Sequence, residues 1–78
     1  MGQEKLFVRT TTISETDKGV QASRINCYLY DDLDIAHKAY EQLVPDDEWD
    51  TLIETGEGFY KVEEDGYINT FFVEVRKV

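Results

Sequence analysis

The amino-acid sequence predicts a small α+β domain in which two β-hairpins flank a helical segment, in the order ββ-α(α)-ββ. Three observations predict this class: β-forming residues dominate both ends of the chain, apolar residues recur every three or four positions in its middle, and glycine-containing turns separate the runs. Strands grouped around a helical middle favour an antiparallel sheet with one longer and one short helix on one face. We expect a single domain over residues 1–78, near the lower size limit for folding alone.

The first hairpin is predicted from two β-forming runs. Residues 5–13 are rich in Val, Ile, Phe and Thr, and a Ser-Glu-Thr-Asp-Lys-Gly segment with turn composition follows them. Residues 20–30 then alternate, which places Ile25, Cys27 and Leu29 on one face of a strand. We expect this face to point inward, so that Cys27 is a buried packing residue and not a reactive thiol.

The middle of the chain predicts two helices. Either Asp31 or Asp32 can cap the first, whose apolar residues recur at helical spacing up to Val44. Pro45 ends this helix, because the residue before a proline disfavours the α-helical region. The same proline opens a second, shorter helix that ends at Gly56, a residue suited to a helix C-terminus.

The last third of the chain predicts the second hairpin. The Glu64-Asp65-Gly66 segment forms its turn, since Asp-Gly between two β-forming runs is a strong hairpin signal. In the final strand Phe71 and Phe72 point to opposite faces. The sheet is therefore expected to carry apolar side chains on both faces, one of which needs a cover.

Negative charge is concentrated in residues 31–65, which contain thirteen Asp or Glu and two Lys, a formal charge of −11. The remaining residues contain four acids and six bases, so they contribute +2 to the net charge of −9. A chain with this charge is repelled by nucleic acids and anionic membranes and attracted to basic surfaces. We expect no direct binding to nucleic acid or to membranes. The near-neutral flanks also disfavour an overall adaptation to high salt.

The residues predict no catalytic, cofactor or metal site. His37 is the single histidine and Cys27 the single cysteine, so a zinc site lacks ligands. Residues 46–50 are acidic, but the loop that they begin lacks the central glycine of a calcium-binding EF-hand. No segment has the glycine spacing of a phosphate-binding loop. Because no catalytic motif is present, we expect that the protein is not an enzyme. With one cysteine and no apolar run like that of a signal peptide, we expect a cytoplasmic protein, in the host cytoplasm if a phage encodes it.

Seven carboxylates and one aromatic residue are the candidate partner-binding residues. They lie in or beside the predicted helices: Asp32, Asp34, Glu41, Asp46, Asp47, Glu48, Trp49 and Asp50. Together with the acids of the 63–65 turn, they would match a groove lined by Lys and Arg. Trp49 has two interpretations. Its ring covers the sheet from the second helix, or it is exposed among the acids as an interface anchor.

We therefore hypothesise a non-enzymatic inhibitor whose acidic surface occludes a basic, nucleic-acid-binding site on a partner protein. In its strongest form the surface imitates a DNA backbone, as an anti-CRISPR or anti-restriction protein from a phage or plasmid would. The alternative is a structural or assembly subunit, or a homodimeric domain, whose acidity serves only solubility. The two hypotheses differ in salt dependence, because exposed charges are screened by salt and apolar contacts are not.

Overall fold

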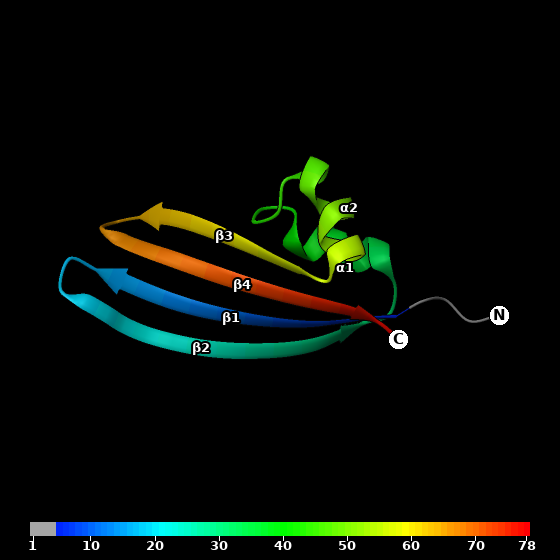
Figure 1. The fold of residues 1–78 in the computed structure, drawn as a ribbon, viewed down its shortest axis with the longest axis horizontal. Coiled ribbons are helices and arrows are strands. Elements are labelled where there is room, and N and C mark those ends of the chain that lie inside the picture. Colours follow the sequence, from blue (N-terminus) through cyan, green and yellow to red (C-terminus); the bar gives the residue numbers. More distant parts are fainter. Residues whose placement is uncertain (1–4) are drawn as a thin grey trace.

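A four-stranded antiparallel sheet and two short helices make up the computed structural model of the chain, which describes residues 5–78 (Figure 1). The elements follow one another as β1 (Leu6–Thr16), β2 (Gly19–Tyr30), α1 (Leu33–Tyr40), α2 (Asp46–Thr55), β3 (Glu57–Glu64) and β4 (Tyr67–Lys77). The predicted α+β class and the order ββ-α-α-ββ are confirmed.

The strand order in the sheet is β2-β1-β4-β3, so the first and last strands of the chain pair at its centre. Their register runs from Leu6 opposite Lys77 to Glu15 opposite Ile68. Each outer strand is the hairpin partner of one central strand. β1 continues to Thr16, beyond the predicted end of this strand, and its pairing with β2 shifts in register after Ser14.

The turn between β3 and β4 confirms the sequence prediction in detail. Its two residues are Asp65 and Gly66, and both have positive φ, 52° and 81°. This is the backbone of a type I′ turn, whose twist matches that of the flanking strands. Glycine and aspartate tolerate such φ values better than most residues.

The predicted caps at Asp32 and Gly56 are present, but the prediction of a longer first and a shorter second helix is wrong: α1 has 8 residues and α2 has 10. Asp32 Oδ1 accepts a hydrogen bond from the Ile35 amide at 2.8 Å. α1 then ends at Tyr40, and the chain continues to Val44 in a turn whose amides bond back to the Tyr40 carbonyl. Pro45 disfavours helical backbone at the residue before it, which explains this loosening. At the end of α2, Gly56 has φ 87° and donates to the Leu52 carbonyl at 2.8 Å.

The core lies between the helices and one face of the sheet. Its buried apolar side chains come from the two central strands, both helices and the α1–α2 connection: Leu6, Val8, Ala36, Val44, Trp49, Leu52 and Val73. Trp49 is 6% exposed, so its ring covers the sheet, and the interpretation as an exposed anchor is wrong. Thr10 extends this face, and its hydroxyl shares a 2.8 Å hydrogen bond with the Tyr40 hydroxyl.

The opposite face of the sheet has no cover within residues 5–78, and it carries the side chains that were expected inside. Ile25, Cys27 and Leu29 are all exposed, so the prediction of an inward-pointing β2 face is wrong. β2 is an edge strand, and these residues share the face that points away from the helices. Alternation places residues on a common face, but it does not say which face the helices cover.

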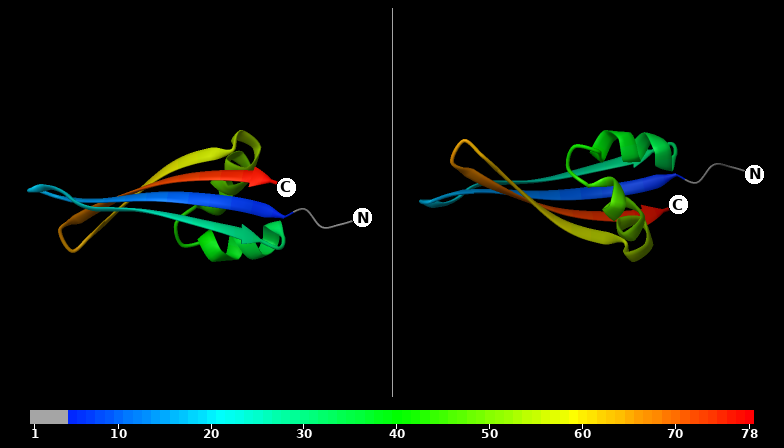
Figure 2. Two further views of the ribbon diagram at one scale, coloured as in Figure 1. Left: turned by 90° about the horizontal axis from the view of Figure 1, so that it is seen from below. Right: turned by 90° about the horizontal axis from the view of Figure 1, so that it is seen from above.

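The sheet is much longer than the helical layer that covers it. The described chain measures 51 × 23 × 19 Å along its principal axes. Figure 1 shows both helices over the end of the sheet where β1 begins and β4 ends, while the two hairpin turns project at the other end. The views in Figure 2 agree, and they show the twist of the two projecting hairpins. The core is therefore confined to one end and one face of the sheet.

Replacement of Leu52 by alanine tests the assignment of the core. Leu52 is 1% exposed, so the cavity left by the substitution should lower the free energy of unfolding by about 2–5 kcal/mol. The control is Ile35→Ala on α1, where the side chain is 51% exposed and a change of about 0.5 kcal/mol or less is expected. Urea denaturation followed by circular dichroism measures both. Equal losses for the two variants would contradict this core.

Candidate interaction surface

Nearly all of the net charge lies on the helical side of the sheet. Residues 31–56, which we call the acidic layer, contain nine Asp or Glu and one Lys, a formal charge of −8 out of −9 for the chain. They form both helices, their connection and the short links to the strands. A single layer of the fold therefore carries the negative field of the molecule.

The structure brings the seven predicted carboxylates together on this layer. Six of them are exposed: Asp34, Glu41, Asp46, Asp47, Glu48 and Asp50. The seventh, Asp32, is half-buried, because its carboxylate caps α1. Three of the exposed acids form the first turn of α2, where the positive end of the helix dipole stabilises them. Part of the acidity thus stabilises the helix itself.

Trp49 lies beneath this surface and is not on it. Its indole ring stacks on the imidazole of His37, with ring centroids 4.8 Å apart and an interplanar angle of 8°. The Nε2 atom of His37 lies 3.1 Å from Asp46 Oδ1. This contact fastens the end of α1 to the start of α2, a role that sequence reasoning missed. The available signal was a histidine in the last turn of one helix and an acidic first turn in the next.

Within residues 5–78, few basic side chains neutralise the carboxylates of the acidic layer. Arg9 pairs with Glu74 on the sheet, and the contact of His37 with Asp46 between the helices is an ion pair only when the imidazole is protonated. The pKa of the Tyr60 phenol is raised, first by burial and second by the negative charge of Glu48. The field of α2 therefore reaches the neighbouring strand β3.

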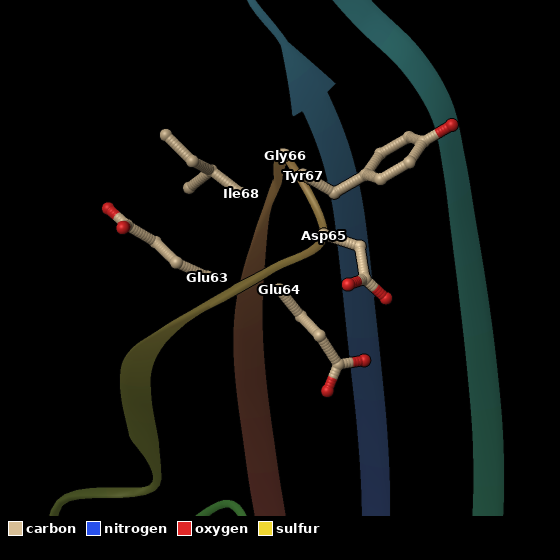
Figure 3. Close-up of a pocket in the computed structure, with 6 residues that line it drawn as sticks. All are labelled: Glu63, Glu64, Asp65, Gly66, Tyr67 and Ile68. Atoms are coloured by element: carbon tan, nitrogen blue, oxygen red, sulfur yellow. The ribbon is translucent and has the colours of Figure 1, made fainter.

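The acids of the β3–β4 turn do not belong to this surface. Residues 63–65 lie at the projecting end of the sheet, far from the helices in Figure 1, so the expected continuous acidic groove is not formed. An open hollow there is lined by residues 63–68. In Figure 3 the Glu63 carboxylate points to one side of the hairpin and those of Glu64 and Asp65 to the other. Their carboxylates do not converge on a common ligand position.

The described residues form no Cys–His pair, no metal-binding cluster and no membrane-spanning helix. Cys27 lies on the sheet face opposite the helices, so the sheet separates its thiol from the imidazole of His37. Between residues 5 and 78, no group of three or more His, Cys, Asp or Glu side chains is arranged to hold a metal ion. Neither α1 nor α2 has the length and apolar character needed to cross a membrane.

Two tyrosines should make stability depend on pH in the alkaline range. Burial raises the pKa of Tyr30 and Tyr60 above the ordinary value of 10.0. The folded state therefore favours the neutral phenols, and the unfolded state releases their protons first. Stability from this source is fully present below pH 10 and is lost as pH rises through the raised values.

Urea titrations at a series of pH values from neutral to strongly alkaline measure this loss. Tyr60→Phe keeps the ring but removes the ionisable hydroxyl, so the alkaline fall in unfolding free energy should be smaller in this variant. An identical fall in the variant and the unsubstituted chain would contradict the environment described for Tyr60.

Known proteins provide no further guide to this surface. Comparisons with protein-family models, with curated proteins and with solved structures find no match to this chain. The interpretation of the acidic layer therefore depends on its charge and geometry.

Proposed function

We propose that this chain is a non-enzymatic binding domain whose acidic layer docks on a positively charged site of a partner protein and occludes it. The observation that carries the proposal is the separation of charge: the acidic layer has a formal charge of −8, and the rest of the chain has −1. A field of one sign on one side of a small domain steers association with a basic surface.

The spacing of the carboxylates supports a partner that otherwise binds nucleic acid. α2 carries five acidic residues in ten, over about 15 Å of helix axis at 1.5 Å per residue. The average of one charge per about 3 Å, with four of the five acids in residues 46–50, compares with about 3.4 Å per charge along one strand of DNA and about 1.7 Å along the duplex. Lys and Arg side chains spaced for phosphates would therefore meet carboxylates at a comparable density.

Occlusion needs no catalytic group, and exposed carboxylates on a fixed surface are sufficient for it. Steering brings the acidic layer to the basic site, and contact then excludes the nucleic acid by competition for the same cations. We propose that the protein is a cytoplasmic inhibitor of a DNA-binding nuclease, and that a phage or plasmid carries it against host defence. The buried Trp49 and Leu52 hold α2 on the sheet, so the carboxylates are presented on a fixed surface.

Two variants with the same change in net charge test the proposal. The first neutralises α2 by Asp46→Asn, Asp47→Asn, Glu48→Gln and Asp50→Asn. The control neutralises four acids at the projecting turns by Asp17→Asn, Glu63→Gln, Glu64→Gln and Asp65→Asn. Each variant is immobilised to capture proteins from a host lysate, and the partner that the unsubstituted chain retains is then titrated at several salt concentrations.

The α2 variant should bind this partner at least about tenfold more weakly and with a shallower salt dependence, because four steering charges are lost. The control variant should keep both the affinity and the salt dependence of the unsubstituted chain. Equal retention of the partner by both variants would show that the acidic layer does not bind it. Equal loss in both would indicate that only net charge matters.

A further inference from the structure

The sheet face opposite the helices carries an apolar surface that spans all four strands. We call it the open face. Its large apolar side chains include Phe7, Ile13, Ile25, Leu29, Phe59, Ile68 and Phe72. Ile25 is 63% exposed and Phe59 is 66% exposed, although they belong to opposite edge strands. Monomeric proteins rarely expose contiguous apolar patches of this kind unless another surface covers them.

Strand register places Ile25, Phe72 and Phe59 in one row, which we call the apolar band, and a row that holds the Arg9–Glu74 ion pair separates it from Phe7 and Leu29. Ile25 lies opposite Thr11, Thr11 opposite Phe72, and Phe72 opposite Phe59, so one row crosses the sheet from edge to edge. The rings of Phe59 and Phe72 are in contact, with centroids 5.2 Å apart. Phe7 and Leu29 are paired two rows away on the same face. The open face therefore combines an apolar band across all four strands with charged side chains on either side of it.

The charges of the open face are balanced, unlike those of the acidic layer. Three basic residues, Arg9, Lys61 and Arg76, share this face with four acidic ones, which gives a formal charge of −1. One pair is already joined: the Arg9 guanidinium donates to Glu74, with an Nε–Oε1 distance of 2.8 Å. Two copies of this chain would repel one another strongly through their acidic layers. The open face is the side on which they can meet with little repulsion.

The size of the open face suits a stable contact between two copies. Four strands about 4.8 Å apart, paired over about ten residues at about 3.3 Å per residue, make a face of roughly 600 Å² in projection. Two such faces reach about the 1,200 Å² at which specific interfaces begin. Within residues 5–78 the core holds seven buried apolar residues, so burial of further apolar area would add substantially to the stability of a domain of this size.

We infer that the protein is a homodimer in which the open faces of two copies pack against each other. The contact is isologous, so each face supplies both the apolar band and the balanced charges. The two sheets lie about 10 Å apart, as in a β-sandwich. The helices then form the outer layers, and the two acidic layers point in opposite directions. This arrangement does not depend on the function proposed for the acidic layer.

Three single substitutions with the same change in charge test the dimer. Ile25→Asp and Phe59→Asp each place a carboxylate in the apolar band, on β2 and β3 respectively. Ile35→Asp is the matched control, because Ile35 is also exposed but lies on α1, on the other side of the sheet. All three positions are exposed, so circular dichroism should show the same fold in each monomer. Sedimentation velocity across the micromolar range measures the mass.

The unsubstituted chain and Ile35→Asp should sediment as dimers, and both band variants as monomers. A monomer for the unsubstituted chain at every concentration would overturn the inference. A dimer that survives Phe59→Asp but is lost in Ile25→Asp would indicate pairing of β2 edges, and it would also overturn face-to-face packing. A dimer in all four proteins would place the contact elsewhere.

Cys27 provides an independent measurement, because its exposed thiol lies on the open face. In the dimer the thiol is covered, so its rate of reaction with Ellman's reagent should fall as protein concentration rises. In the Ile25→Asp and Phe59→Asp variants the rate should stay constant. A rate that is independent of concentration in the unsubstituted chain, under conditions where sedimentation shows a dimer, would exclude the open face as the contact.

Discussion

The pairing of β1 with β4 is the contact on which the rest of the structure depends. It joins the two ends of the chain over ten residues on each strand, from Leu6–Lys77 to Glu15–Ile68. Each hairpin alone has only two strands, and an isolated two-stranded hairpin is marginally stable in water. The central pair unites them in one sheet, and it supplies Leu6, Val8 and Val73 to the core. Bringing two strands together across most of the chain costs conformational entropy, so the side chains that this pairing buries must compensate for it.

The sheet gives the molecule two sides with different physical properties. One side carries the helices, whose apolar faces are fixed on the sheet by Trp49 and Leu52 and whose outer faces are acidic. The other side has apolar rows and balanced charges. Because the two sides are separated by the thickness of a sheet, one can bind a basic partner while the other contacts a second copy. The proposed function and the inferred dimer are therefore compatible, and each can fail without the other.

Local chemistry made much of the fold predictable. The Asp65–Gly66 turn, the Asp32 cap and the Gly56 helix end each depend on a few neighbouring residues, and all three are found in the structure. The acidic character of the helical layer was also evident from composition. The sequence left two alternatives for Trp49, core or interface, because helical spacing alone does not measure how deeply a side chain is buried.

Long-range features were harder to predict. The inward placement of Cys27 failed because strand alternation leaves the choice of covered face to tertiary packing. The stack of His37 on Trp49 depends on how the α1–α2 connection turns, which no local pattern specifies. The acids of residues 63–65 were grouped with the helices by sequence proximity, whereas the extended β3 carries them to the far end of the sheet.

Amide hydrogen exchange followed by NMR tests the central role of the β1–β4 pair most directly. The slowest amides should lie in residues 6–12 and 71–77, where both neighbours in the sheet and the helical layer protect the backbone. The amides of β2 and β3 that point away from the sheet, and those of both turns, should exchange faster. Exchange that is as fast in β1 and β4 as at the outer edges would contradict this account of the fold.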